Sequence, residues 1–266
     1  MITEIPDLSM TPNIKELRIR YCKNLIEIGD SVGCLDKLEV WDIAGCHKLE
    51  TLPNCLMMKS LESFNLNGCE RIKKFPNILH EMKGVEYLSL HGNFTNELPP
   101  SFGNLIGLKG LSMTSRSGKA HLPGSIYNLQ HIESLDLYGD FIFPKNAEID
   151  RQPMCNSLVC SSEYVFRSLK RLSLYFLKNC SDIEFMLNYC CPLTLEELGI
   201  SGCEVVTLLE SMSRFERLHT LYISFCNEFR EIPRLPHGIR YLDVAYCHSL
   251  DLQSFFQVYL SLKDIK

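Results

Sequence analysis

One short pattern of apolar residues recurs ten times along the 266-residue chain. In each copy, apolar residues stand at the first, fourth and sixth positions, and in six copies the ninth position is cysteine. The copies begin at Ile14, Leu38, Leu61, Val85, Leu108, Ile132, Leu169, Leu195, Leu218 and Ile239. The first six starts are 23 or 24 residues apart. A pattern kept in frame this often constrains the fold strongly, because each short copy can bury its apolar residues only against its neighbours.

The spacing within each copy predicts a strand with one buried face, because apolar residues alternate at its fourth and sixth positions. Many copies continue to a second apolar residue followed by proline, as in Leu52-Pro53 and Leu98-Pro99, which suits an extended return turn. This combination is typical of leucine-rich repeats. We therefore predict an α/β repeat solenoid, a leucine-rich-repeat horseshoe with a concave parallel β-sheet and an irregular or short-helical convex side.

The spacing also divides the chain. We expect a single leucine-rich-repeat domain over residues 1–266, with a regular array over 14–144 and a second array over 169–250. An irregular insertion is expected over 145–168, because Ile132 and Leu169 are 37 residues apart. A degenerate repeat around Met154 and Leu158 is the alternative. Residues 251–266 form a C-terminal tail.

Six of the cysteines occupy one slot of the repeat. The chain has 13 of them, an odd number that excludes complete internal pairing. We interpret the slot as a buried structural ladder, because a thiol is small and can donate a weak hydrogen bond where the backbone turns inward. The ladder residues are Cys22, Cys46, Cys69, Asn93, Cys203, Cys226 and Cys247. Side chains stacked in one direction do not meet as disulfide geometry requires, and no C-x-x-C spacing indicates zinc.

No catalytic motif is present, so we expect no enzymatic activity and no catalytic, cofactor-binding or metal-binding residues. The net charge of −5 argues against a nucleic-acid partner, and no segment reaches the length of apolar residues that a membrane span needs. Two glycosylation sequons, at Asn93 and Asn179, favour an extracellular protein, but Asn93 falls in the inward ladder slot. The cysteine spacing instead predicts free thiols, which favour a reducing compartment.

Several segments resemble the repeat region of plant disease-resistance proteins of the TIR–nucleotide-binding–leucine-rich-repeat family. They include residues 5–9, 12–17, 35–38, 67–69 and 73–76, and the ending 234–236, 241–244 and 247–250. The resemblance covers roughly residues 2–250. It implies a cytoplasmic or nuclear sensor that recognises a pathogen effector or a guarded host protein and restrains the nucleotide-binding domain of the same or a related receptor. The TIR and nucleotide-binding activities do not carry over, because this sequence contains neither part.

The outward strand positions supply a candidate partner-binding face, since exposed aromatic residues on a sheet are typical interface anchors. The candidates are Arg18, Arg20, Tyr138, Tyr175, Phe176, Tyr222, Phe225, Tyr241 and Tyr246. Some of these aromatic rings could instead pack against flanking loops. Two other functions stay open: an extracellular leucine-rich-repeat receptor ectodomain, and a leucine-rich-repeat adaptor or scaffold such as a ubiquitin-ligase substrate receptor.

Overall fold

Every copy of the repeat forms one strand in the computed structural model. The structure describes residues 2–92, 98–115, 118–144, 165–208, 210–232, 234–251, 253 and 255–256. The chain divides into two compact units. The described residues of unit 1 lie within Met1–Ile132 and Phe141–Ser161, and those of unit 2 lie within Glu133–Asp140 and Ser162–Lys266.

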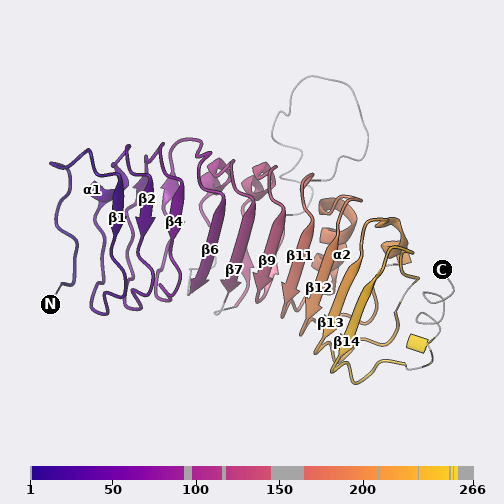
Figure 1. Cartoon of the computed structure of the whole chain (residues 1–266). Coiled ribbons are helices and arrows are strands. Elements are labelled where there is room, and N and C mark those ends of the chain that lie inside the picture. The colour runs from indigo at the N-terminus through magenta and orange to yellow at the C-terminus, as the bar shows by residue number, and fades with distance from the viewer. Residues whose placement is uncertain are drawn as a thin grey trace, which may run out of the picture. The chain divides into compact units, whose positions relative to one another are not determined.

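The strands of unit 1 follow one another in chain order and pair in parallel in two groups (Figure 1). The strand β1 (Glu16–Arg18) pairs with β2 (Val40–Asp42), which pairs with β4 (Ser63–Asn65). The strand β6 (Tyr87–Gly92) pairs with β7 (Gly110–Ser115), and within the described residues β4 and β6 do not pair. Equivalent repeat positions face one another, so that Leu17 lies opposite Trp41 and Trp41 lies opposite Phe64. The repeat spacing therefore sets the register.

Unit 2 contains five parallel strands in chain order. They are β9 (Ser134–Tyr138), β11 (Arg171–Tyr175), β12 (Glu197–Ser201), β13 (Thr220–Ser224) and β14 (Tyr241–Ala245). Leu172 lies opposite Leu135 on one side and Leu198 on the other, and the same register continues to β14.

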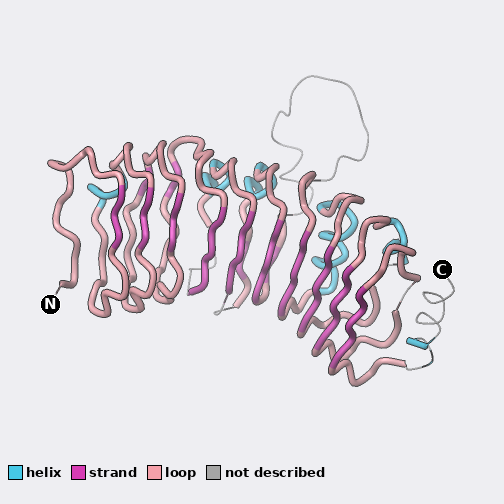
Figure 2. Tube along the Cα trace, in the orientation of Figure 1, coloured by secondary structure: helices cyan, strands magenta, loops and turns pink. Residues whose placement is uncertain are grey.

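The second half of each repeat returns through short helical turns and two-residue strands (Figure 2). In unit 1 these are α1 (Asp30–Gly33), β3 (Cys55–Leu56), β5 (Asn77–Ile78), η1 (Pro100–Asn104), β8 (Ala120–His121), η2 (Gly124–Asn128) and β10 (Phe141–Ile142). In unit 2 they are α2 (Cys180–Phe185), η4 (Met186–Cys190) and η5 (Glu210–Arg214). Strand β3 pairs with β5, and β10 pairs with β8.

The core lies between the strands and their return segments. In unit 1 the Trp41 ring stacks on Phe64 at a centroid distance of 4.7 Å, and Phe75 meets Phe102 edge-on at 5.3 Å. The apolar strand positions are buried in the inner repeats, whereas Leu17 in β1 and Leu242 in β14 are half-buried because each of these strands pairs on one side only. The predicted fold class, an α/β leucine-rich-repeat solenoid, is confirmed.

Most of the expected insertion at 145–168 lies outside the described residues. Its last residues are described. Phe166 is buried, and its backbone N–H donates to the Cys190 carbonyl at 3.1 Å.

Candidate partner-binding face

The ladder cysteines follow the strands and point inward. The Cys46 thiol donates to the Ile19 carbonyl at 3.2 Å, and the Cys69 thiol donates to the Ile43 carbonyl at 3.0 Å. In each case the acceptor is the third apolar residue of the preceding repeat. In unit 2 the Cys203 thiol lies 3.5 Å from the Leu174 carbonyl oxygen. Each thiol therefore satisfies a carbonyl that the turn leaves without a backbone partner.

Cys226 and Cys247 lie farther from the carbonyl of the preceding repeat, and each has a nearer acceptor two residues back, at 3.4 and 3.5 Å. The Cys226 sulfur lies 3.9 Å from the Ile200 carbonyl oxygen, and the Cys247 sulfur lies 3.9 Å from that of Ile223. Cys22, in the first repeat, donates to the Arg20 carbonyl at 3.6 Å. Asn93 lies outside the described residues.

The buried ladder thiols hold their protons tightly. Burial raises the pKa of Cys69 and Cys203 to about 12 and that of Cys226 to about 11. Burial also raises the pKa of Cys191, which follows the equally buried Cys190 in the chain. Protonated thiols serve as hydrogen-bond donors, whereas nucleophilic attack and metal ligation need the thiolate. Within the described ranges, no group of three or more His, Cys, Asp or Glu side chains is arranged to hold a metal ion.

In eight of the repeats, the residue just before the ladder position adopts a left-handed backbone. Gly45, Gly68, Gly139 and Gly202 have φ between 64° and 118° there. In four repeats the same position carries an aromatic residue with φ between 55° and 62°: Tyr21, Phe176, Phe225 and Tyr246. Such a backbone is rare for bulky residues and disfavoured by contact of Cβ with the main chain. We call these four the edge aromatics.

The edge aromatics lie at the ends of the strands, beside the sheet surface. All four are more than half exposed, from 55% for Phe225 to 72% for Tyr21. The Phe176 ring covers Gly202, where an added Cβ would lie 2.4 Å from the ring, and Tyr21 covers Gly45 in the same way. The Phe225 and Tyr246 rings stack at a centroid distance of 4.7 Å. Each ring therefore packs against a neighbouring repeat and remains more than half exposed.

The remaining predicted aromatic residues lie on the strands of unit 2 and pair. Tyr138 stacks on Tyr175 with centroids 4.1 Å apart and planes 2° apart. Tyr222 and Tyr241 are 5.1 Å apart and tilted by 48°. Burial and a hydrogen bond with Tyr175 raise the pKa of Tyr138 to about 12. The sheet surface of unit 2 therefore carries two tyrosine pairs.

The two predicted arginines belong to unit 1 and form ion pairs. Arg18 pairs with Glu16, and the Arg20 Nε donates to Asp42 Oδ2 at 2.6 Å. Burial raises the pKa of the Asp42 carboxyl, but hydrogen bonds from Arg20 and from the Ala44 backbone, together with the arginine charge, outweigh it, and the pKa lies below its ordinary value. These arginines belong to unit 1, whereas both tyrosine pairs belong to unit 2.

The predicted list lacks Tyr87 of β6, an exposed aromatic residue on the strand face. Its side chain is 67% exposed and lies over Gly110, where an added Cβ would approach the ring to 2.7 Å. Tyr87 occupies the same outward strand position as Tyr241, so complete columns of the repeat would have found it.

The sequon at Asn179 has a structural role. The Asn179 side-chain oxygen accepts from the Ser181 backbone N–H at 3.1 Å, and its amide donates to Asp182, so Asn179 is the N-cap of α2. In the described part of the chain, every helix is too short or too polar to cross a bilayer.

Comparison with known proteins identifies the repeats. The family described as "Disease resistance protein RPS4B-like, leucine-rich repeats" matches residues 57–260. Disease resistance protein RRS1B of Arabidopsis thaliana is 30% identical over 92% of this chain and 16% of its own length. Disease resistance-like protein DSC1 of the same plant is 28% identical over 92% of this chain and 23% of its length, and TMV resistance protein N of Nicotiana glutinosa is 23% identical over 93% and 25%.

The chain thus spans a quarter or less of the length of these relatives. Among solved structures, the Leptospira interrogans LRR protein LIC12759 matches with a TM-score of 0.52 at 15% identity, over 99% of this chain and 74% of that one, which supports the fold. The resemblance to the repeat region of plant disease-resistance proteins is confirmed. Because the family match covers most of the ten repeats, the chain belongs to the leucine-rich repeats of RPS4B-like disease resistance proteins.

Proposed function

We propose that this chain is the recognition and autoinhibition part of an intracellular plant immune receptor. In this proposal it works in the cytoplasm or the nucleus and catalyses no reaction. Its partners are a pathogen effector or a guarded host protein, and the nucleotide-binding domain of the same or a related receptor. Membership of the disease-resistance repeat family supports recognition as the role, because leucine-rich repeats are scaffolds for protein interaction.

The aromatic side chains of unit 2 carry the proposal. Seven of them lie on its strands or at the strand ends: Tyr138, Tyr175, Phe176, Tyr222, Phe225, Tyr241 and Tyr246. The last five are 42% to 65% exposed. Aromatic residues bury a large area with few rotatable bonds, which makes them frequent anchors of protein interfaces. Their density on one unit favours a partner there.

The test replaces Tyr175, Phe176, Tyr222 and Phe225 together with alanine. The chain is expressed in leaf cells with the nucleotide-binding region of an intracellular plant immune receptor, and co-precipitation and cell death are measured. We expect the variant to bind roughly tenfold more weakly or worse, since truncated interface anchors lose that much affinity, and to release cell death.

Tyr189→Ala is the matched control. Tyr189 is an exposed aromatic residue of the same unit, but it lies in η4 on the return side. It should leave binding and repression unchanged. A folded quadruple variant, with an unaltered circular dichroism melt, that binds and represses like the parent chain would contradict the proposal.

A further inference from the structure

Two clusters of the same composition lie on the strand face of unit 2. Each contains two paired tyrosines and one aspartate on the same face. The first joins Asp136 and Tyr138 of β9 to Tyr175 of β11, which lies opposite Tyr138. The second joins Tyr222 of β13 to Tyr241 and Asp243 of β14, with Asp243 directly opposite Tyr222. We call them the first and second Tyr-Tyr-Asp clusters.

The strand face of unit 2 carries unbalanced negative charge. Its outward strand positions hold three acids, Asp136, Glu197 and Asp243, and one base, Arg171, which leaves a net −2. Arg171 lies opposite Glu197, so the surplus falls on the two clusters. In unit 1 the outward charges of the first two repeats balance, because Arg18 pairs with Glu16 and Arg20 pairs with Asp42.

A tyrosine face beside a carboxylate is a favourable site for a cationic side chain. The ring attracts the cation through its quadrupole, and the carboxylate accepts charge-assisted hydrogen bonds, for which the guanidinium group is best suited. We propose that the two Tyr-Tyr-Asp clusters bind two arginine or lysine side chains of an extended basic segment of the partner. This inference deepens the proposed function, on which it rests, by naming the chemistry of the partner.

The spacing of the clusters sets the spacing of the cations. Three strand intervals separate the β9–β11 pair from the β13–β14 pair, and neighbouring strands are ~4.8 Å apart, which gives about 14 Å. An extended chain advances ~3.3 Å per residue, so two basic residues four positions apart span this distance. Between the clusters lie the small residues Ser173, Gly199 and Ser201, which leave room for a crossing backbone.

Fluorescence anisotropy with a labelled peptide tests the proposal on the whole chain. The probe is Gly-Arg-Ser-Gly-Ser-Arg-Gly, with its arginines four positions apart. Comparison peptides replace both arginines with citrulline, which keeps the shape and removes the charge, or place them side by side. We expect the citrulline peptide to bind at least tenfold more weakly and the adjacent-arginine peptide to bind severalfold more weakly.

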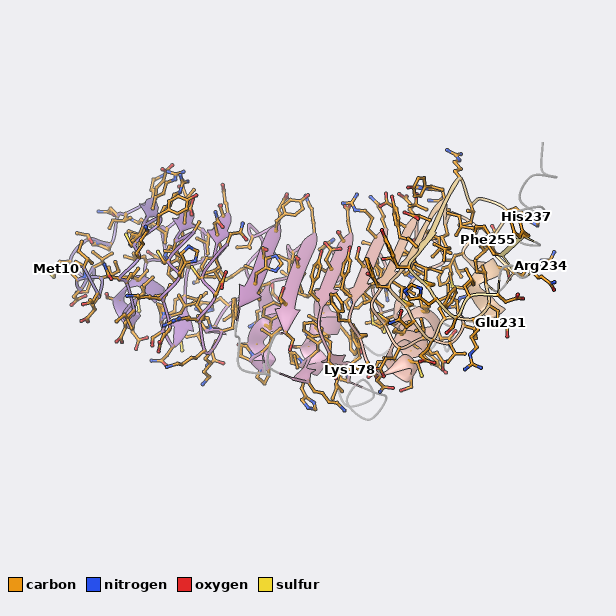
Figure 3. The ribbon with its side chains drawn as sticks, turned by 90° about the horizontal axis from the view of Figure 1, so that it is seen from below. Met10, Lys178, Glu231, Arg234, His237 and Phe255 are labelled. Atoms are coloured by element: carbon orange, nitrogen blue, oxygen red, sulfur yellow. The ribbon has the colours of Figure 1, made fainter. Side chains whose placement is uncertain are left out.

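Single substitutions test whether each cluster contributes to binding of the probe peptide. Asp136→Asn, Asp243→Asn and Tyr222→Leu should each weaken the probe about three- to tenfold. The matched control is Glu231→Gln, which removes the same charge from unit 2. Glu231 is exposed and lies away from β13 and β14, beside Thr207 on the return side (Figure 3).

Two results would overturn the proposal. One is a citrulline peptide that binds as tightly as the arginine probe. The other is an equal loss of probe affinity in Glu231→Gln and Asp243→Asn, because the attraction would then come from the net charge of the chain and not from the clusters. Failure of the inference is distinguishable from failure of the proposed function. The alanine variants of the edge and strand aromatics could lose the protein partner while Asp136→Asn and Asp243→Asn keep it. That result would support the proposed recognition role and contradict the proposal that the partner presents a basic segment.

Discussion

At the scale of single residues, the turn before the ladder position decides which side chains reach the surface. A left-handed backbone there is natural for glycine and disfavoured for other residues. The chain nonetheless places Phe176, Phe225 and Tyr246 in it, each packed on the following repeat or stacked with its neighbour. The ring contacts with a neighbouring repeat favour this backbone conformation. The four edge aromatics therefore pack against the stack although they are exposed.

Two glycines three residues apart provide a matched stability test. Gly202→Ala should lower the free energy of unfolding by about 1–3 kcal/mol, because φ is +64° and the new Cβ would collide with the Phe176 ring. Gly199→Ala should change it by less than about 0.5 kcal/mol, since its Cβ meets only ordinary contacts at 3.7 Å. Urea denaturation measures both. Equal midpoints for the two variants would refute the role of the turn.

The ladder thiols make stability depend on alkaline pH. Unfolded thiols lose their protons near pH 9, whereas burial raises the pKa of Cys203 to about 12 in the folded chain. The folded state therefore binds more protons, and its stability falls as pH rises from about 9 to about 12.

Cys203→Ser isolates this effect, because serine can donate the same hydrogen bond and does not titrate. Between pH 7.5 and 10 the parent chain should lose about 1 kcal/mol more unfolding free energy than the variant. Urea melts at both pH values measure the difference. Parallel losses in the two proteins would show that the thiol stays protonated in both states or in neither.

At the scale of elements, the strands could be predicted from the sequence and the side-chain positions at their ends could not. The alternation of Leu198 and Ile200 fixes β12 and its register, because a shift by one residue would expose both. Phe176 follows the strand residue Tyr175, and the repeat pattern predicts it on the same partner-binding face. The left-handed turn redirects it to the edge. The spacing of apolar residues predicts the strand, but it does not show at which residue the alternation between inward and outward side chains ends.

The tyrosine pairs show the same division. That Tyr138 and Tyr175 share a column follows from the repeat frame. Their stacking at 4.1 Å depends on the strand spacing and on rotamers that one sequence does not specify. Gly45 and Gly202 each lie under the aromatic ring of the preceding repeat, a contact that the sequence alone does not reveal.

The helix α2 depends on its cap. Asn179→Ala should lower the unfolding free energy by about 1 kcal/mol, since the Ser181 amide loses its acceptor. Asn179→Ser should be more stable than Asn179→Ala, because serine also caps a helix and places no second carboxylate beside Asp182. Thermal melts followed by circular dichroism distinguish the two. An alanine variant as stable as the serine variant would contradict the capping role.

At the scale of the whole molecule, each repeat is stabilised mainly by its immediate neighbours, as in other stacked repeats. Leu198 of β12 is fully buried and lies between Leu172 and Leu221. Truncating it removes contacts on both sides at once. Damage should therefore spread to the adjacent strands and fade with distance along the chain.

Hydrogen exchange can follow that spread. Leu198→Ala should cost about 2–5 kcal/mol locally and speed amide exchange in β11, β12 and β13. Exchange in β1 and β2 should remain at the parent rate. Exposed Tyr189→Ala serves as the control and should alter neither region. A uniform rise across all strands would mean that the chain unfolds as one cooperative block.

The left-handed turn also bears on how such a surface can diversify. In this chain the left-handed slot holds glycine in four repeats and phenylalanine or tyrosine in four others. The strands beside it pair in the same register whichever residue fills it. Because Gly202 lies under the Phe176 ring, a larger residue at position 202 needs that ring to be displaced or replaced. New contacts on this edge therefore arise through paired changes in adjacent repeats.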